Sequence, residues 1–281
     1  MKFYKYHGAG NDFLIADNRD GSVVLSAEQI AALCDRRYGV GADGLMLLES
    51  PLDAKPASFR MTYYNSDGSG GMMCGNGGRC IVAFAADMGL TDFSFLAPDG
   101  HHVGEIISAD GAEKTIRLQM KNVHALSYYE NLSGVHVPSE GYFLDTGTRH
   151  FVRFVEDIDR YDVIGEGRDI RYGAVELQPL GVNVNFVEMY EGMLKVRTYE
   201  KGVEDETFAC GTGIVASSIA AYKAGISPSG VSGNMVRYDV KAKRDRLKVE
   251  FRPSGSSGVV AEDVWLTGPA VFVAEMEVPI L

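Results

Sequence analysis

The sequence predicts a β-rich α/β protein of the α+β type, built from one domain that occurs twice. Two stretches carry this prediction, residues 74–90 and residues 210–226, because each begins with a cysteine and two spaced glycines and continues as a run of helix-forming residues. Each run reaches a glycine, Gly89 or Gly225, of the kind that closes helices in a left-handed conformation. Two equivalent stretches in a chain of 281 residues indicate a doubled domain rather than a longer array of repeats.

Other landmarks repeat with nearly the same offset along the chain. An alternating strand, residues 61–65, precedes the first of the two cysteines, and residues 196–200 precede the second in the same way. Near the start of the chain, residues 10–15 align with residues 147–152. The duplication therefore extends beyond the cysteine stretches and includes the strands in front of them.

A chain of this length accommodates two globular domains of about 140 residues each. Each domain is expected to form short strands around its cysteine helix. We predict an N-terminal domain of residues 1–118 with 267–281 and a C-terminal domain of residues 119–266. The strands expected in the first are 2–6, 14–15, 45–48, 59–64, 93–96, 103–107, 115–119 and the returning strand 270–278. Those expected in the second are 142–145, 150–155, 184–190 and 194–199, with a weak helical signal between residues 156 and 172. Loops are expected at 50–58 and 252–258.

Two of the four cysteines are expected in the hydrophobic core. A capping box that starts at Ser26 predicts a helix over residues 26–36 with Cys34 on its apolar face. Cys80 lies among apolar residues of the helix predicted after Cys74. Buried thiols of this kind behave as small apolar side chains.

Charge and hydropathy exclude several classes of partner. The net charge of −11 and the isoelectric point near 5.0 argue against nucleic acid or an anionic membrane, because no basic stripe is present. No apolar run approaches the roughly 20 residues of a membrane span, and the first residues lack the apolar segment of a signal peptide. We therefore expect a cytoplasmic protein with reduced thiols and a small-molecule partner.

Each motif cysteine, Cys74 or Cys210, is expected at the N-terminus of a helix. Unpaired backbone N–H groups and the positive end of the helix dipole favour a thiolate there and can hold a carboxylate beside it. The glycines that follow each cysteine allow a ligand to approach this backbone closely. Two equivalent sites suggest that the doubled fold brings two matched thiols to one cleft.

Four interpretations of the cysteine pair are open at this point. A structural zinc site needs about four ligands at characteristic spacings, which Cys74, Cys80 and Cys210 do not provide. A dithiol redox couple usually needs Cys-x-x-Cys, which neither helix start contains. Two unrelated buried thiols would make the repeat a coincidence. We favour the fourth interpretation, proton transfer at a carbon from opposite faces, in which one thiolate is the base, one thiol is the acid and no cofactor is needed.

Five segments of the chain together resemble the diaminopimelate epimerase family. They are His7-Gly-Ala-Gly-Asn-Asp-Phe13, Gly39-Val-Gly-Ala-Asp-Gly44, Asn65-Ser-Asp-Gly-Ser69, Cys74-Gly-Asn-Gly-Gly-Arg-Cys80 and Cys210-Gly-Thr-Gly213. The resemblance implies two pseudo-symmetric domains, each a curled, mostly antiparallel sheet wrapped around a central helix. It also implies the interconversion of LL- and meso-diaminopimelate without a cofactor, in lysine and peptidoglycan biosynthesis.

The resemblance further implies roles for individual residues. Cys74 and Cys210 become the catalytic acid and base, and no metal ligand is implied. The residues implied as substrate contacts are Gly75, Asn76, Gly211 and Thr212 around the reacting carboxylate, Asn11, Asn65, Thr148 and Asn183 as polar contacts, and Glu200 with Lys201 at the distal amino-acid end. A homodimer is a further expectation.

The chain departs from the family's usual pattern at positions that concern the substrate. Residues 147–150, Gly-Thr-Arg-His, stand where the family usually has Gly-Asn/Ser-Pro-His, and we interpret His150 as structural. Lys201 replaces an arginine, and an ammonium cannot reproduce the planar two-point grip of a guanidinium on a carboxylate. Two alternatives therefore stand beside the epimerase: a racemase of the same fold for another amino acid, and an amino-acid-binding protein without turnover.

Overall fold

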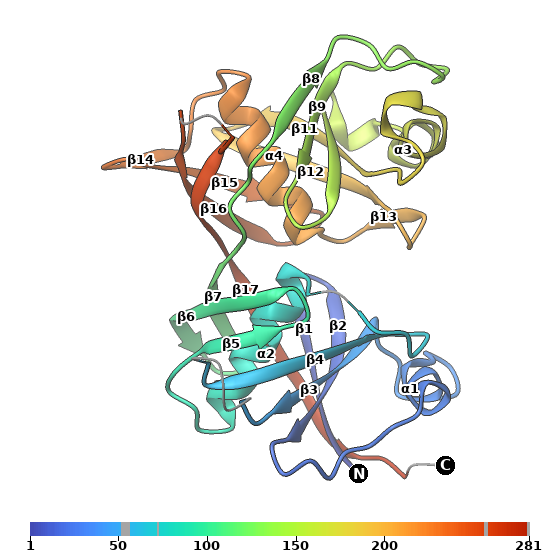
Figure 1. The fold of residues 1–281 in the computed structure, drawn as a ribbon, viewed down its shortest axis with the longest axis vertical. Coiled ribbons are helices and arrows are strands. Elements are labelled where there is room, and N and C mark those ends of the chain that lie inside the picture. Colours follow the sequence, from blue (N-terminus) through green and yellow to red (C-terminus); the bar gives the residue numbers. More distant parts are fainter. Residues whose placement is uncertain (52–56, 72, 256–257, 280–281) are drawn as a thin grey trace. The chain divides into compact units, whose positions relative to one another are not determined.

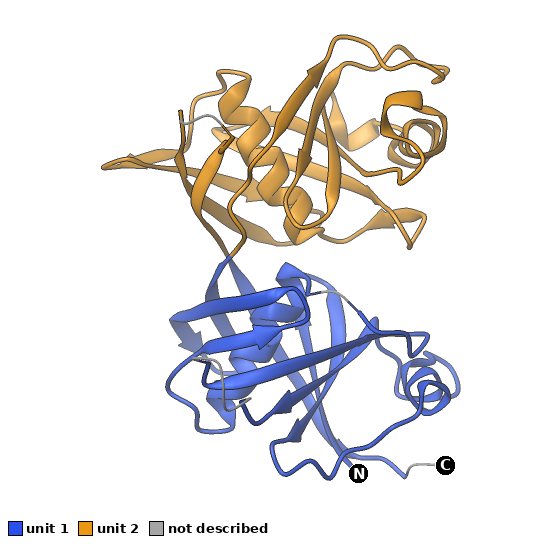
Figure 2. Ribbon diagram, in the orientation of Figure 1, with its two compact units in different colours: residues 1–119, 267–281 blue, residues 120–266 orange. Residues whose placement is uncertain are grey.

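Two compact units make up the chain. The computed structural model describes residues 1–51, 57–71, 73–255 and 258–279. Unit 1 contains residues 1–119 and 267–281, and unit 2 contains residues 120–266 (Figure 2). The loops expected at 50–58 and 252–258 lie partly outside the described residues.

Unit 1 contains a sheet that closes on itself (Figure 1). Its strands are β1 (Lys2–Gly8), β2 (Asn11–Asn18), β3 (Gly44–Glu49), β4 (Phe59–Asn65), β5 (Ser94–Ala97), β6 (Gly100–Asp110), β7 (Glu113–Gln119) and the unit 1 part of β17 (Ala261–Glu277). Each strand from β1 to β7 pairs with the next, and β17 pairs with both β7 and β1, which completes the circuit. The pairs β2–β3 and β4–β5 are parallel, and the others are antiparallel.

Helix α2 (Gly75–Asp87) is enclosed by this sheet. It contacts β1, β2, β3, β6 and β7, and every residue from Gly75 to Ala85 is buried. A helix that is buried on all sides needs such an enclosure, because it presents no face to water. The helix also supplies the crossover that the parallel pair β4–β5 requires. It closes at Gly89, which has the expected positive φ of 83°.

Helix α1 (Ala27–Cys34) makes the other parallel crossover of unit 1, between β2 and β3. The predicted capping box is confirmed, because the Ser26 hydroxyl accepts from the Gln29 N–H and the Gln29 side chain accepts from the Ser26 N–H. The buried face of α1 includes Cys34, as expected, and it packs in one cluster with Leu14 of β2. This packing holds the segment between β2 and β3 against the sheet.

Unit 2 repeats the connections of unit 1 in the same order. Its elements are β8 (Leu126–Tyr129), β9 (Gly141–Asp145), β10 (Arg149–Phe154), η1 (Ile158–Arg160), α3 (Val163–Gly173), η2 (Val175–Leu177), β11 (Asn183–Tyr190), β12 (Met193–Glu200), β13 (Asp205–Thr207), α4 (Gly211–Lys223), β14 (Gly230–Ser232), β15 (Met235–Lys241) and β16 (Arg246–Pro253). The pairs β9–β10, β11–β12 and β15–β16 are antiparallel, and β10–β11 and β12–β15 are parallel. Helices α3 and α4 are the crossovers, as α1 and α2 are in unit 1. The predicted fold class, a sheet-dominated α+β protein with two pseudo-symmetric halves, is confirmed.

Helix α3 occupies the stretch in which the sequence gives only a weak helical signal. Its glycines lower the intrinsic propensity for a helix. The helix forms because Asp162 caps it by accepting a hydrogen bond from the Gly165 N–H at 2.9 Å, and because its apolar face is buried. Gly167 is required by packing, since a Cβ there would lie 2.5 Å from the Cβ of Tyr199. Tertiary packing thus stabilises a helix for which the local propensity is weak.

A hydrogen-bonded pair holds the loop between β8 and β9 against α3. The His136 backbone N–H donates to Asp169 Oδ2 at 2.7 Å, and the His136 ring Nδ1 lies 2.6 Å from Asp169 Oδ1. This hydrogen bond raises the pKa of the exposed His136 above its ordinary value. The protonated His136 therefore stabilises the folded state, and this contribution is fully present at a pH below its pKa of about 6.5 in the unfolded chain. The contribution is lost as the pH rises through its pKa in the folded protein. An NMR titration should therefore give His136 a pKa above about 6.5, and Asp169→Asn should lower it.

A second acid in unit 2 provides the control for this titration. Asp159 is exposed and pairs with Lys195 at 2.8 Å, so Asp159→Asn removes one carboxylate without touching the His136 pair. The His136 titration should be unchanged in that variant. If Asp169→Asn left the His136 pKa where it is in the unmodified protein, the hydrogen bond would not be its cause.

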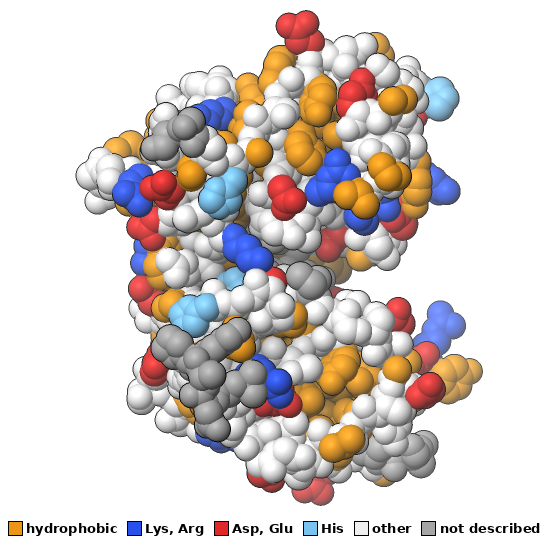
Figure 3. All heavy atoms as spheres, in the orientation of Figure 1, with side chains coloured by type: hydrophobic (Ala, Val, Ile, Leu, Met, Phe, Trp, Pro, Cys, Tyr) orange, Lys and Arg blue, Asp and Glu red, His pale blue; other side chains and the backbone are white. Residues whose placement is uncertain are grey.

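The surface shows mixed charge on the face drawn in Figure 3. Lys and Arg side chains are scattered among Asp and Glu side chains there, so that this face offers a polyanion no continuous basic strip. Within the described parts of the chain, the structure contains no helix that is long and apolar enough to cross a membrane.

Candidate active site

The first motif cysteine, Cys74, is the N-cap residue of α2, as predicted. Its backbone is extended (φ −120°, ψ 152°), and its sulfur accepts a hydrogen bond from the Gly77 N–H at 3.2 Å. The thiol is half-buried. An N–H donor and the positive end of the helix dipole both favour a thiolate at this position.

The second motif cysteine, Cys210, is the N-cap residue of α4 and is 7% exposed. Its sulfur lies 3.5 Å from the Thr212 hydroxyl oxygen, whereas the sulfur of Cys74 meets a backbone N–H. Gly213 permits the start of α4 to approach β11 closely, since a Cβ at this position would lie 2.2 Å from Asn185 Oδ1. The two helix starts are therefore equivalent in position but differ in the group that faces the sulfur.

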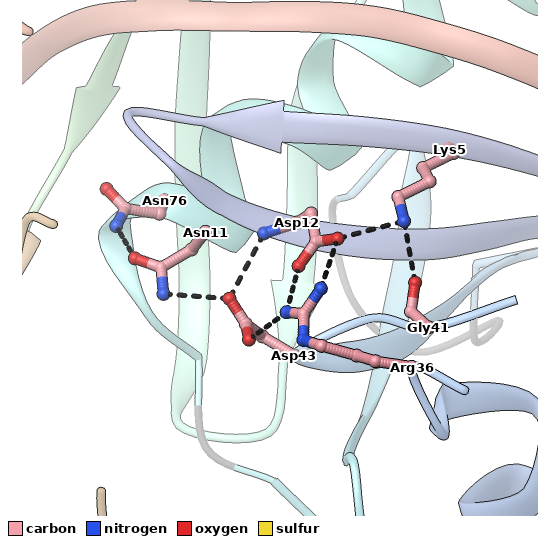
Figure 4. Close-up of polar contacts among 7 residues, drawn as sticks. All are labelled: Lys5, Asn11, Asp12, Arg36, Gly41, Asp43 and Asn76. Atoms are coloured by element: carbon pink, nitrogen blue, oxygen red, sulfur yellow. Dashed lines mark hydrogen bonds and ion pairs between the residues drawn. The ribbon is translucent and has the colours of Figure 1, made fainter. Parts of the chain in front are cut away.

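A chain of hydrogen bonds extends from α2 to Asn11 in unit 1 (Figure 4). The guanidinium of the fully buried Arg79 donates to the Gly75 carbonyl at 3.1 Å and to Asn76 Oδ1 at 2.7 Å. Asn76 Nδ2 donates to Asn11 Oδ1, and Asn11 Nδ2 donates to Asp43 Oδ2 at 3.1 Å. Two residues predicted as substrate contacts, Asn11 and Asn76, thus contact each other at the start of the cysteine helix.

A second chain of hydrogen bonds lies at the start of α4 in unit 2. The Thr212 hydroxyl oxygen lies 3.1 Å from that of Thr148 and 3.0 Å from His150 Nε2. Asn185 Nδ2 can only donate, so His150 Nδ1 at 3.1 Å accepts, and the proton of the neutral imidazole is on Nε2. Burial lowers the pKa of His150 to about 3. His150 is therefore neutral at physiological pH, and these contacts agree with its interpretation as structural.

The two hydrogen-bond chains correspond through the duplication. Asn76 and Thr212 are both the second residue of their cysteine helix. Asn11 aligns with Thr148 in the repeat, and each contacts the helix residue of its own unit. The duplication therefore extends to side-chain contacts beside both cysteines.

Asn65 is the last residue of β4, and its side chain belongs to the turn that follows. Its Nδ2 donates to Ser69 Oγ at 3.0 Å and to the Gly70 carbonyl at 3.5 Å. Within the described residues, its side-chain hydrogen bonds stay in this turn and do not reach Asn11 or Asn76. Its predicted role as a substrate contact depends on the turn and stays a prediction.

The other predicted contacts of unit 2 gather near the end of β12. The amide of the buried Asn183 joins two segments, because Nδ2 donates to the Arg149 carbonyl at 3.0 Å and Oδ1 accepts from the Lys201 N–H at 2.9 Å. Glu200 Oε2 accepts from the Thr207 hydroxyl at 2.8 Å across the β12–β13 hairpin. Asn183 thus fixes the turn at which Glu200 and Lys201 sit.

Arg149 and Lys201, which depart from the usual family pattern, both bind the loop of residues 177–181 in unit 2. The Arg149 guanidinium donates to the carbonyls of Leu177 at 3.0 Å and Gly181 at 3.2 Å, and it packs over the Phe143 ring. Lys201 Nζ donates to the Leu180 carbonyl at 2.9 Å and is exposed. Arg149 therefore has a structural use, whereas Lys201 can exchange a solvent-exposed hydrogen bond for one with a ligand.

Two open depressions of the unit 2 surface lie away from the cysteine. One, of about 630 Å³, is lined by Met189, residues 191–193, residues 226–229 and Asp239. The other, of about 600 Å³, is lined by α3 residues with Gly134 and His136. Neither includes Cys210, and the chemistry of the helix starts, rather than the size of a hollow, identifies the candidate site.

Cys34 and Cys80 differ from the motif cysteines in environment. Both are buried, as expected, at 4% and 0% exposure. Burial raises the pKa of the Cys34 thiol to about 11, and burial raises that of Cys80 further above its usual range. Both thiols are protonated at neutral pH, and Cys34 offers a control for experiments on the motif cysteines.

Sequence reasoning missed three charged residues that orient this site, namely Arg79, Asp43 and Arg36. A signal for Arg79 was present, because a cation within an otherwise apolar helix, one turn after Gly75, must bond to the helix start or to the enclosing strands. For Asp43 the signal was a carboxylate between glycines in residues 39–44, where backbone and side-chain donors can surround it.

Comparison with known proteins points to one family. The family model described as diaminopimelate epimerase matches residues 3–124 and 142–273. A diaminopimelate epimerase of Flavobacterium psychrophilum is 41% identical over an alignment that covers 98% of this chain and 99% of that protein. A diaminopimelate epimerase of Chlorobaculum tepidum is 40% identical over 269 residues, which cover 94% of this chain and 95% of that protein.

Solved structures share the fold at low sequence identity. A phenazine biosynthesis protein of the PhzF family from Bacillus anthracis aligns with a TM-score of 0.71 at 16% identity and covers 100% of this chain and 99% of its own. A probable proline racemase from Agrobacterium radiobacter K84 aligns with a TM-score of 0.67 at 15% identity and covers 99% of this chain and 93% of its own. At these identities the likeness concerns the fold alone.

Proposed function

Because the chain belongs to the diaminopimelate epimerase family, we propose that it interconverts LL- and meso-diaminopimelate by proton transfer between Cys74, Cys210 and the α-carbon of the substrate. The family predicted from the sequence is confirmed, and with it the class of enzyme, an isomerase of amino-acid biosynthesis. The residues and the mechanism that follow are our proposal for this chain.

One observation carries the mechanism: each unit supplies one cysteine as the N-cap of a buried helix. Inversion of a stereocentre with an acidic C–H needs a base on one face and an acid on the other. One thiolate removes the α-proton, the electron pair of the C–H bond passes to an enolate-like carboxyl group, and the other thiol protonates the opposite face. The reverse reaction exchanges the two roles, so that the balance requires no oxidant, reductant or cofactor.

The helix starts are also suited to the charge that develops on the substrate. First-turn N–H groups of a helix have no partner within the helix, and they can hold a carboxylate whose negative charge increases on deprotonation. We assign this cradle to the amides of Gly75 and Asn76 in unit 1 and of Gly211 and Thr212 in unit 2. The preorganised side chains of Asn11 and Thr148, each bonded to its helix start, support the assignment.

The far end of diaminopimelate carries an ammonium and a carboxylate. We propose that Glu200 meets the ammonium and that Lys201 meets the carboxylate, with Asn65 and Asn183 as further polar contacts. The position of Glu200 and Lys201 at one turn, which Asn183 fixes, supports this pairing. A substrate that lacks one of these two charges would leave either Glu200 or Lys201 without its partner, at a cost of about 1–3 kcal/mol.

The α-proton exchange of a panel of amino acids in D₂O tests the proposed substrate. LL- and meso-diaminopimelate should exchange, whereas lysine and glutamate should exchange little, because each lacks part of the far charge pair. Glu200→Gln should lower kcat/KM for diaminopimelate about tenfold or more, since one bond to a charged group is lost. Alkylation of the two motif cysteines by iodoacetamide should be unaffected.

Glu191→Gln is the matched control, because Glu191 is exposed in the turn at the other end of β12. It should leave the exchange of diaminopimelate unchanged. Faster exchange of lysine or another monoamino acid than of diaminopimelate would overturn the substrate and favour a racemase of the same fold. If the unmodified protein catalysed α-proton exchange of no amino acid in the panel, the proposal that it is an enzyme would be overturned.

Location and assembly are part of the same proposal. We place the protein in the cytoplasm, because a mechanism with two free thiols needs a reducing compartment. The four cysteines are free in the structure, which is compatible with that requirement. The expected homodimer stays a prediction, and sedimentation velocity at micromolar protein tests it.

A further inference from the structure

The orientation of two side-chain amides in unit 1 is determined by a buried cation. A guanidinium has only donors, so the atom of Asn76 that faces Arg79 at 2.7 Å is the oxygen Oδ1. The amide nitrogen of Asn76 therefore faces Asn11, which presents its own Oδ1. Each orientation follows from the one before it, and the series begins at a side chain that is fully buried.

Asp43 ends this series with a group that only accepts (Figure 4). Its Oδ2 receives the amide of Asn11 at 3.1 Å and the Asp12 N–H at 3.2 Å. Its Oδ1 receives the Arg36 guanidinium at 2.6 Å. Both oxygens face donors, so a carboxylate is the only side chain of this size that satisfies all of them.

Asp43 is itself held by a network of ion pairs. Arg36 also pairs with Asp12 at 2.6 Å, and Lys5 pairs with Asp12 at 2.9 Å. Burial alone would raise the pKa of Asp12, but the hydrogen bonds from Arg36 and Lys5 lower it below its ordinary value. The network joins β1, the start of β2 and the residue before β3, so Asp43 is anchored to the sheet.

We propose that Asp43 is a positioning residue that acts through Asn11. One N–H of the Asn11 amide donates to Asp43, which leaves the second N–H in a fixed direction for an acceptor oxygen of the substrate's amino-acid group. Without Asp43 the amide keeps only its bond from Asn76 and loses the bond that fixes its nitrogen, so its N–H groups are no longer held in one direction toward the substrate. The inference rests on the proposed function, in which Asn11 is a substrate contact.

Steady-state epimerisation of diaminopimelate by Asp43→Ala tests the inference. The KM should rise about tenfold with kcat nearly unchanged, because the lost interaction is made with the substrate before and during the reaction. Asp17→Ala is the matched control, since Asp17 of β2 is another carboxylate of unit 1 but forms its ion pair with the exposed Arg19 at the surface, outside the network of Asp43. It should leave both constants unchanged.

A double-mutant cycle separates positioning from a general structural effect. In the Asn11→Ala background, Asp43→Ala should change KM less than about twofold, because the residue through which it acts is gone. If Asp43→Ala does not fold, as judged by circular dichroism, Asp43→Asn replaces it in the cycle. The asparagine side chain has only one acceptor oxygen, so its NH₂ group must face one of the donors that Asp43 binds.

The outcomes separate this inference from the proposed function. The positioning role would be overturned if the effects of the Asn11 and Asp43 substitutions on KM were additive. It would also be overturned if Asp43→Ala lowered kcat and thermal stability but left KM unchanged. An unmodified protein that does not turn over diaminopimelate would overturn the proposed function, and with it the basis of the inference.

Discussion

Cys74→Ala and Cys210→Ala should each reduce the rate of diaminopimelate epimerisation by about 10²- to 10⁴-fold. Either substitution leaves one face of the α-carbon without a group that can take or deliver a proton. The effect should appear in kcat, because proton transfer is made only in the transition state. Chiral chromatography of the product, with LL-diaminopimelate as the starting isomer, measures it directly.

Cys34→Ala is the control for the loss of a thiol. Cys34 is buried in α1, and its raised pKa of about 11 keeps it protonated at neutral pH, so its removal should leave kcat unchanged. The double variant Cys74→Ala with Cys210→Ala should be little worse than either single variant, because the two thiols act as a unit. Substantial turnover by either folded single variant would remove the two-base mechanism.

Much of the fold could be predicted because the duplication repeats its signals. The cysteine helices, their closing glycines and most strands follow from local patterns that occur twice. Helix α3 gave only a weak signal, since packing against Tyr199 requires a glycine in its interior. The repeat itself held the missing signal, because α3 begins 136 residues after α1, the same separation as that of Cys74 and Cys210.

The candidate site was predictable in its members but not in its orientation. Motif resemblance indicates Asn11 and Asn76 as substrate contacts, yet the direction of each amide depends on Arg79 and Asp43. These contacts join residues far apart in the chain, and no local periodicity reports them. Asn183 is also indicated as a substrate contact by the resemblance, but both polar atoms of its side-chain amide bind the backbone of unit 2.

Arg79→Met should destabilise unit 1 by about 3–5 kcal/mol, the largest effect on folding that we expect from one substitution. Arg79 is fully buried, and its guanidinium donates to the carbonyls of Gly75 and Pro269 and to Asn76 Oδ1. Methionine keeps much of the volume but removes these donors, and each buried acceptor that loses one costs about 1–3 kcal/mol. The loss falls on the first turn of α2 and on its junction with β17, which together hold Cys74 in place.

Guanidinium denaturation followed by circular dichroism measures this effect, and Trp265 fluorescence reports on unit 2 separately because it is the only tryptophan and lies in that unit. The matched control is Arg117→Met, since Arg117 of β7 forms its ion pair with the exposed Glu105 at 3.0 Å. Exposed pairs contribute about 0–1 kcal/mol, so this variant should unfold nearly as the unmodified protein does. Equal midpoints for Arg79→Met and Arg117→Met would mean that the buried guanidinium does not anchor the start of α2. A large difference between them, by contrast, would tie the stability of unit 1 to the same bonds that orient Asn76 and Asn11.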